Sequence, residues 1–375
     1  AIRYPFTVAT DSRSMVFAFP NFYWSTSGET SNADDLLILD ASVEAPDGTV
    51  VPIYFEGSRS TTIASGATDP LCDALLPSSF SKTVFAKGEE YFFKARIKSS
   101  GTIPYTSERA SFGGGLASWY DDTATTVSST DSAGNYTVLS GPSLDVRTLG
   151  YAPIMLGQQV TPIPTVIVTG TSSSEGVGQT DNGSLGIGQM QKAFNLVADN
   201  YYVPSITFAK TSGTMPIAIN GTKWRDYLKY CTDAVQQMGS NDTSVNESTM
   251  QSRLSSLWGI LSSAPSIRTV SQTGWNPRTT STDNWRTTAN QTEINKWDTG
   301  EIAYNVQTWM ATQVGVQIDD FEYLDGFRDS VEPTKWIVNG STNYATSDGT
   351  HSNDAGTMLI VPELQNLMAR NNITP

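Results

Sequence analysis

The sequence predicts two differently built parts: a β-rich N-terminal part of the sandwich or jelly-roll type, and a C-terminal α/β part. Residues 1–150 show alternating extended runs, frequent Gly/Ser-rich breaks and no convincing helical period. From about residue 165, short β-branched runs alternate with segments of helical periodicity, which implies a parallel sheet with helices on both faces. A length of 375 residues is long for a single core. We therefore expect domains at 1–150 and 165–375, with a proline-containing linker over 151–164.

Two stretches support the β-rich part. In EEYFFKARIK, residues 89–98, the side chains of Tyr91, Phe93, Ala95 and Ile97 fall on one face of a strand. In residues 36–57, two extended runs surround a Pro-Asp-Gly turn, which is typical of a hairpin.

The C-terminal part reads as strand, helix, strand along most of its length. Leu254 and Leu257 belong to a helical stripe that follows Ser244-x-x-Glu247, a pattern resembling a capping box. Strands are expected at 165–168, 205–210, 233–238, 266–273 and 316–324, and further helices at 185–200, 291–313 and 355–370.

Composition disfavours several classes of function. The net charge of −14 and the pI of about 4.5 repel phosphate backbones and anionic lipids, so nucleic-acid partners and membrane-surface binding are not expected. No run of 18 apolar residues predicts a membrane span. Cys72 and Cys231 show no metal-ligand spacing and are expected to be buried free thiols, although a bridge between the two parts stays open. No metal or organic cofactor is expected.

The start of the chain and its overall composition bear on its location. It opens AIRYPF, without Met or a signal-peptide core, and reads as a mature or trimmed product. Low lysine content and abundant Ser, Thr and Asn favour a location outside the cell.

The only histidine of the chain, His351, lies in a Gly/Ser/Asp loop three residues after Asp348. Ligands of open α/β sheets bind at the carboxyl ends of the strands, so the polar turns that follow the predicted strands are candidate site segments. These turns are residues 170–176, 211–214, 239–242 and 348–351.

These turns supply the parts needed for acyl transfer. A serine hydroxyl becomes nucleophilic when a base takes its proton, and His351 is the one imidazole available, with Asp348 able to orient it. The N–H groups of Ser172 and Gly213 and the amide of Asn241 are candidate oxyanion donors.

The four turns also resemble the four sequence blocks of the SGNH (GDSL-type) hydrolases, over about residues 160–375. The resemblance rests on Gly170-Thr171-Ser172-Ser173-Ser174-Glu175-Gly176, Gly213, Gly239-Ser240-Asn241-Asp242 and Asp348-Gly349-Thr350-His351. It implies a three-layer α/β/α, flavodoxin-like fold and an esterase or lipase-type serine hydrolase. By register with the family, Ser172 would be the nucleophile, His351 the base and Asp348 the residue orienting that base. Ser172, Gly213 and Asn241 would form the oxyanion hole.

Two positions depart from the family pattern. Thr171 stands where an Asp usually precedes the nucleophile, so whatever that carboxylate supports is missing or replaced. Ser352 stands where a proline often follows the histidine. Neither change removes a catalytic group.

The expected substrate is an O-acetylated carbohydrate. A β-sandwich ahead of an SGNH hydrolase resembles arrangements in carbohydrate O-acetyl esterases and in virion tailspike deacetylases, so a secreted or virion-surface location is expected. The alternatives are a lipase or thioesterase of the same superfamily, and an inactive glycan-binding or virion-surface module, which Thr171 favours.

Aromatic and acidic residues near the strand ends give weaker signals. Trp224, Trp275 and Trp285 are interpreted as core or loop anchors rather than sugar-stacking walls. Asp319, Asp320 and Asp325 are interpreted as solvated or structural rather than as a glycosidase pair.

Overall fold

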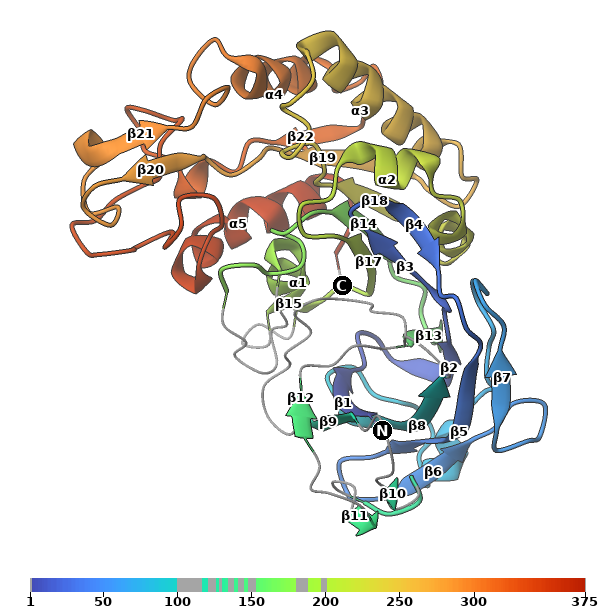
Figure 1. Cartoon of the computed structure of the whole chain (residues 1–375). Coiled ribbons are helices and arrows are strands. Elements are labelled where there is room, and N and C mark those ends of the chain that lie inside the picture. The colour runs from blue at the N-terminus through green and yellow to red at the C-terminus, as the bar shows by residue number, and fades with distance from the viewer. Residues whose placement is uncertain are drawn as a thin grey trace.

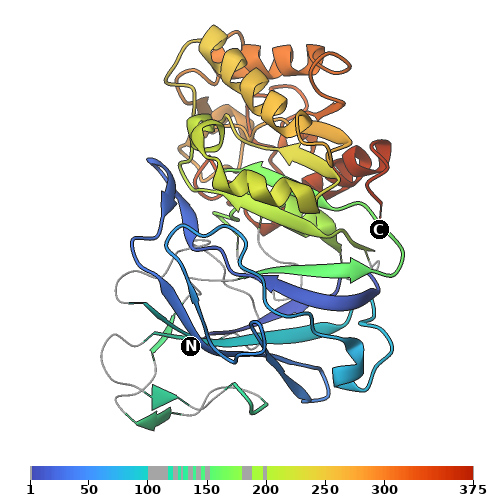
Figure 2. The same ribbon diagram turned by 90° about the vertical axis from the view of Figure 1, so that its right-hand side faces the viewer.

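The computed structural model of the chain describes residues 2–99, 117–120, 126–127, 130–133, 138–140, 145–147, 153–179, 188–196 and 201–374, and the architecture is that of these residues. Figures 1 and 2 show a β-rich part beside an α/β part. The strands of the β-rich part are β1 (Ile2–Thr7), β2 (Ser12–Ala18), β3 (Phe22–Ser25), β4 (Gly28–Ser31), β5 (Leu36–Glu44), β6 (Val50–Ile53), β7 (Thr61–Ile63), β8 (Glu90–Ser99), β9 (Ala117–Tyr120), β10 (Thr126–Val127), β11 (Val138–Ser140), β12 (Asp145–Arg147) and β13 (Ile154–Gln159).

The β-rich part has two antiparallel layers with a common core. One layer is a seven-stranded sheet in the order β12-β9-β1-β8-β5-β6, with β7 pairing to β5. The other is built on the pair β2–β13. Phe17 of β2 meets Phe93 of β8 with ring centroids 4.9 Å apart, and Tyr91 and Ala95 of β8 are buried in the same core. The predicted alternation along β8 and the sandwich class are thus confirmed.

The predicted hairpin at residues 36–57 is also present. β5 pairs antiparallel with β6, and the turn between them closes through Gly48 N–H donating to Ala45 O at 2.9 Å. Gly48 adopts φ +85°, which a glycine accepts without strain.

Part of the predicted linker at 151–164 forms the strand β13 instead. β13 pairs with β2, and its alternating side chains contact two different cores: Met155 packs on the β-rich core, whereas Ile154 and Leu156 pack on a core of the α/β part. The three apolar residues of β13 are half-buried, because each face of this part of the strand contacts a core. The boundaries at residues 150 and 165 stay predictions.

The C-terminal part is built on a five-stranded parallel sheet. Its order, β17-β14-β18-β19-β22, is the second strand, then the first, third, fourth and fifth, which is the flavodoxin-like order. The three-layer α/β/α prediction is confirmed. The strands are β14 (Val166–Gly170), β17 (Ser205–Ala209), β18 (Asp233–Gln236), β19 (Thr269–Thr273) and β22 (Asp320–Glu322).

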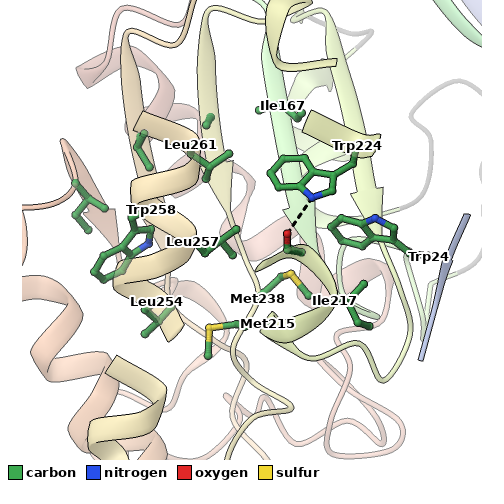
Figure 3. Packing of buried hydrophobic residues seen from close by; sticks show 14 of the residues in the cluster. Trp24, Ile167, Met215, Ile217, Trp224, Met238, Leu254, Leu257, Trp258 and Leu261 are labelled. Carbon is green, nitrogen blue, oxygen red and sulfur yellow. Dashed lines mark hydrogen bonds between the residues drawn. The ribbon is translucent and has the colours of Figure 1, made fainter. Parts of the chain in front are cut away.

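Helices cover both faces of this sheet because successive apolar residues of β14 point to opposite faces. Ile167 of β14 belongs to the core under α2, α3 and α4, whereas Val166 and Val168 belong to the core under α1 and α5. Figure 3 shows the first of these cores, with Leu254 and Leu257 of α3 turned toward the sheet. The helices are α1 (Gln189–Phe194), α2 (Met215–Asn220), α3 (Glu247–Ser262), α4 (Ile302–Thr312) and α5 (Asp354–Arg370), with 3-10 turns η1 (Pro77–Phe80), η3 (Lys223–Tyr230), η4 (Thr288–Asn290) and η5 (Asp325–Phe327).

Two local predictions in this part are wrong. The N-cap of α3 is Asn246, whose side chain accepts from Thr249 N–H at 2.9 Å, so Ser244 and Glu247 form no capping box. The predicted helix 291–313 is helical only over α4. Its first residues form β21 (Gln291–Glu293), which pairs antiparallel with β20 (Thr279–Ser281). The side chain of Gln291 also exchanges hydrogen bonds with the backbone of Trp336.

The predicted helix at 185–200 is described only in part. Residues 189–194 form α1, and residues 195–196 form β15 (Asn195–Leu196), which pairs with β16 (Tyr201–Tyr202). Residues 185–187 and 197–200 lie outside the described residues.

The hairpin β3–β4 of the β-rich part docks on the α/β part. Trp24 meets Trp224 edge to face at 6.0 Å between centroids, and Phe22 stacks on Phe208 at 6.1 Å (Figure 3 shows the two tryptophans). Glu29 accepts backbone N–H groups from residues 222, 223 and 224 at the start of η3. Residues from both parts therefore share one apolar core, which makes this interface part of the folded structure.

We expect Trp24→Ala to lower the free energy of unfolding by about 3–5 kcal/mol, because it removes a large buried side chain and leaves a cavity. Chemical denaturation followed by circular dichroism measures the loss. The neighbouring Tyr23 points to the other face of β3 and is half-buried, so Tyr23→Ala is the matched control with a smaller effect. Equal losses of unfolding free energy for both variants would mean that the contacts of Trp24 with the α/β part add no stability of their own.

Candidate active site

The carboxyl ends of β14 and β18 flank the point where the strand order reverses, and the predicted site residues gather there. Ser172 follows β14, and His351 comes from the loop before α5. His351 Nε2 lies 2.9 Å from Ser172 Oγ, and His351 Nδ1 lies 2.7 Å from Asp348 Oδ2. The three predicted catalytic residues thus form a continuous hydrogen-bonded chain, although Ser172 and His351 are 179 positions apart.

The structure distinguishes the three consecutive serines. Only the hydroxyl of Ser172, among these three, contacts His351. Ser173 Oγ accepts from the amide of Asn276 at 3.1 Å, and Ser174 Oγ donates to Gln237 Oε1 at 2.7 Å. The register taken from the family resemblance therefore selects the serine that the geometry places beside the imidazole.

The loop that carries His351 is held by its own side chains. Asp348 Oδ1 accepts the backbone N–H groups of Thr350 and His351, both at 2.8 Å, which leaves Oδ2 for the imidazole. Thr346 Oγ1 donates to His351 O at 2.7 Å and accepts from Gly349 N–H at 2.9 Å. With Asp348 ionised, His351 Nδ1 carries the proton and Nε2 is the acceptor that faces Ser172.

The surroundings of Asp348 favour its ionised form. Partial burial alone would raise the pKa of this carboxyl group, but hydrogen bonds from the His351 ring and from the N–H groups of His351 and Thr350 outweigh burial and hold the pKa well below its usual range. Its side chain is 47% exposed and that of His351 is 16% exposed, so the ring lies mostly inside the site while its partner borders solvent.

Gly178 permits the close approach of the loops that carry Ser172 and His351. It adopts φ +88°, and a Cβ atom at this position would lie 3.0 Å from His351 Cβ and 3.1 Å from Ser352 O. A larger residue would strain the backbone and push the histidine loop away from Ser172. Ser352, in place of the family proline, uses its hydroxyl to accept from Gln189 at 3.2 Å.

The three predicted oxyanion donors have different environments. Ser172 N–H has no acceptor among the described residues. Asn241 Nδ2 donates one hydrogen to Gly213 O at 3.0 Å and keeps a second one. Gly213 differs from its predicted role, because its N–H closes a tight turn by donating to Lys210 O at 2.8 Å. In this structure Gly213 therefore holds Asn241 through its carbonyl group.

Thr171 supplies no carboxylate, and another residue links the nucleophile turn to its neighbour. Glu175 accepts both the N–H and the hydroxyl hydrogen of Thr211, in the turn after β17. Thr171 O accepts the N–H groups of Ser174 and Glu175 at 3.0 Å, which closes the nucleophile turn. The departure from the family motif leaves the Ser172 turn well supported.

Asp242, the residue after Asn241, holds the Asn241 turn through buried hydrogen bonds. It is fully buried and accepts from Met215 N–H at 3.0 Å and from Arg253 at 2.7 Å. Burial raises the pKa of this carboxyl group, and these hydrogen bonds oppose the rise.

Three site residues were missed by the sequence analysis. Asn276 donates to Ser173 Oγ and to Thr350 O, and Gln189 donates to Asn276 Oδ1 at 2.9 Å, so these amides connect the serine and histidine loops. Arg278 donates to Asn241 Oδ1 at 2.7 Å. Asn276 and Arg278 follow β19, the one internal strand whose following turn was not included among the candidate site segments, and the strand-end rule applied to its polar residues would have found them.

The small pocket beside Ser172 is polar. Ser173, Gln189, Gln237, Ser240 and Asn276 line it together with Trp275 and Arg278. Trp275 nevertheless has 2% of its surface exposed, and Trp224 and Trp285 are also buried, so the interpretation of these three residues as anchors is confirmed.

The sequence also raised the state of the two cysteines, a metal site and a membrane span. Cys72 and Cys231 are buried free thiols, and burial raises the pKa of the first to about 11 and of the second to about 12. Within the described ranges, no group of three or more His, Cys, Asp or Glu side chains is placed to hold a metal ion. No helix in those ranges is long and apolar enough to cross a bilayer.

Comparisons with known proteins gave structural likenesses only. No family model and no curated protein matches the sequence. A psychrotrophic esterase from Pseudoalteromonas sp. is 15% identical with a TM-score of 0.39, covering 55% of this chain and 97% of its own. A GDSL-like lipase from Bacteroides thetaiotaomicron is 13% identical with a TM-score of 0.36, covering 56% and 89%.

A family two carbohydrate esterase from Clostridium thermocellum, solved with cellohexaose, is similar over both parts of the chain. It is 11% identical with a TM-score of 0.39 and covers 98% of this chain and 91% of its own. At these scores the likenesses carry no argument about chemistry, which depends instead on the contacts among Ser172, His351 and Asp348.

Proposed function

We propose that this chain is a serine esterase that removes O-acetyl groups from a carbohydrate. The observation that carries the proposal is the chain from Ser172 Oγ through the His351 ring to Asp348, with contacts of 2.9 and 2.7 Å. A hydroxyl, an imidazole with a free Nε2 acceptor and a carboxylate fixing the tautomer are the groups that ester hydrolysis through an acyl-enzyme requires. The same groups favour catalysis over the binding-only alternative.

The reaction uses the groups in two half-steps. Ser172 Oγ attacks the ester carbonyl carbon while His351 Nε2 takes the hydroxyl proton, and the imidazolium is stabilised by Asp348. His351 then gives this proton to the departing sugar alkoxide, which leaves Ser172 acetylated. Water attacks the acyl-enzyme with His351 as base, and acetate leaves as the proton returns to Ser172.

The negative charge on the tetrahedral oxygen needs donors that are already in place. In this proposal they are Ser172 N–H and the second Nδ2 hydrogen of Asn241. Losing one such donor typically costs about 3–4 kcal/mol of transition-state stabilisation. The Asn241 amide is held from both ends, by Gly213 O and by Arg278, so it does not need to reorganise during the reaction.

The polarity of the pocket supports a short acyl group. Amide and hydroxyl side chains predominate in its wall, so an alkyl chain entering it would meet polar groups that lose their water. A lipase or a long-chain thioesterase needs an apolar trough, which these residues do not provide. An acetyl group on a sugar hydroxyl is short and carries no long alkyl chain, so it suits this wall. A location outside the cell or on a virion surface is part of this proposal, because acylated glycans are substrates that would be met there.

We expect the purified protein to release acetate from O-acetylated glycans and to cleave long-chain esters poorly. An enzymatic acetate assay over a panel of acetylated polysaccharides, run beside 4-nitrophenyl acetate and 4-nitrophenyl decanoate, measures the preference. Chemically deacetylated glycans provide the blank. Efficient cleavage of the decanoate without acetate release would contradict the substrate class while leaving the esterase mechanism standing.

A further inference from the structure

Arg278 is a positive charge placed beside the nucleophile. Within the described part of the chain, it is the only ionisable side chain among the residues that line the pocket containing Ser172. The chain as a whole carries a net charge of −14, so a cation at this place stands out against its surroundings. An arginine here needs a physical reason, because desolvating a guanidinium group is costly.

The guanidinium group is held in a fixed plane. Its carbon lies 4.8 Å from the centre of the Trp297 ring, a cation–π contact with a buried indole. One Nη2 hydrogen goes to Asn241 Oδ1 at 2.7 Å. Burial lowers the pKa of Arg278 to about 10, and the negative charge of Asp348 opposes this effect. The group therefore stays charged at neutral pH while part of its hydration is lost.

This charge has no ionic partner of its own. Asp348 is used by the His351 ring, and no carboxylate among the described residues forms an ion pair with Arg278. Four of the five N–H hydrogens of a guanidinium group form two parallel pairs, and each pair includes one hydrogen of Nη2. Whichever Nη2 hydrogen Asn241 accepts, one complete pair stays available, and such a pair matches the two oxygens of a carboxylate.

We propose that Arg278 is a subsite for a carboxylate of the substrate, so that the preferred substrate is an O-acetylated glycan containing uronic acids. This inference rests on the proposed function, and it specifies the sugar on which the acetyl group sits. The subsite acts at contact distance. At physiological ionic strength the repulsion from the acidic surface is screened over about 8 Å, so it does not cancel the local attraction.

A matched pair of substrates tests the subsite. One is an O-acetylated oligogalacturonide with free carboxylates, and the other is the same oligosaccharide with its carboxylates methyl-esterified. We expect wild type to show at least about a tenfold higher kcat/KM for acetate release from the free acid, equivalent to about 1.4 kcal/mol. Arg278→Gln should remove this preference, and Arg278→Lys should retain part of it. Arg286→Gln, an exposed arginine outside the pocket, is the charge-matched control that should behave as wild type.

The competing role is that Arg278 only positions Asn241. In that case Arg278→Gln would lower the rate on both substrates by the same factor and leave their ratio unchanged, which overturns the proposal. Asn241→Ala serves as the reference, because removing the amide should slow both substrates and keep the preference for the free acid.

A binding measurement separates this inference from the proposed function. Calorimetric titration of Ser172→Ala with a deacetylated oligogalacturonide should give binding that the double variant Ser172→Ala/Arg278→Gln loses by about tenfold or more. If wild type released no acetate from any substrate, the proposed function would fail while this titration still decided the subsite. Equal affinities of the two variants would refute it.

Discussion

Replacing Ser172 by alanine is expected to lower kcat for hydrolysis of 4-nitrophenyl acetate by about 10⁴-fold or more, with little change in folding. The substitution removes the hydroxyl that contacts His351, and no acyl-enzyme can form without it. A residual rate above that of water is still expected, because the oxyanion donors and the pocket remain. A fluorophosphonate probe gives a second measurement: wild type should gain the mass of the phosphonyl adduct on Ser172, and the variant should gain none.

The neighbouring serine provides the control for this experiment. Ser174 is buried two residues further along and donates to Gln237, so Ser174→Ala removes a hydroxyl from the same turn without touching the imidazole. Its rate should stay within about tenfold of wild type, since it loses a single buried hydrogen bond. If Ser172→Ala and wild type turned over the ester equally well, the nucleophile assignment and the proposed mechanism would both be wrong.

Asp348→Asn is expected to lower kcat by about 10³- to 10⁴-fold while the loop keeps its shape. The N–H groups of Thr350 and His351 require an acceptor at the Oδ1 position, so the amide oxygen of the variant will settle there and its NH₂ group will face His351 Nδ1. A donor at that place forces the proton of the imidazole onto Nε2. The ring then meets Ser172 with a hydrogen instead of a lone pair, and it cannot act as a base.

Nuclear magnetic resonance can observe this tautomer directly. His351 is the only histidine in the chain, so its imidazole nitrogen signals need no assignment. Wild type should show the Nδ1–H form and the variant the Nε2–H form. The pKa of Asp348 is held well below its usual range, so the carboxylate keeps its role as acceptor and the two proteins should differ wherever the imidazole is neutral. Asp298→Asn, at an exposed carboxylate elsewhere, should leave the tautomer and the rate unchanged. An unaltered tautomer in Asp348→Asn would disprove the orienting role.

The fold was predictable where local pattern and burial agree. Val166, Ile167 and Val168 form a continuous apolar β-branched run because β14 has a core on each face, and this pattern is visible without coordinates. The prediction of one helix over 291–313 was wrong at its start, because the contacts that decide the structure there come from outside the segment. Residues 291–293 pair with β20, and the side chain of Gln291 binds the backbone of Trp336, 45 positions away; no periodicity within the segment reports either partner.

The contact between Ser172, His351 and Asp348 was predictable because chemistry restricted the choice of residues. A single histidine leaves one candidate base, and Asp348 lies three residues before it, at the position that the family resemblance gives to the orienting carboxylate. The surrounding amides could not be predicted. Gln189 and Asn276 are ordinary polar residues in the sequence, and only the fold brings them together across 87 positions. The role of Gly213 also depends on geometry, because only the closed turn with Lys210 shows that its N–H is already used.

The hairpin that carries Trp24 and Glu29 limits how this protein can be divided or recombined. A shortened chain starting at residue 165 would keep the triad, but it would leave Phe208 and Trp224 without the aromatic rings that cover them. It would also lose the carboxylate that binds the first N–H groups of η3. A chimaera that receives a different N-terminal region must therefore retain residues 22–31. Without them it would expose an apolar surface that promotes aggregation.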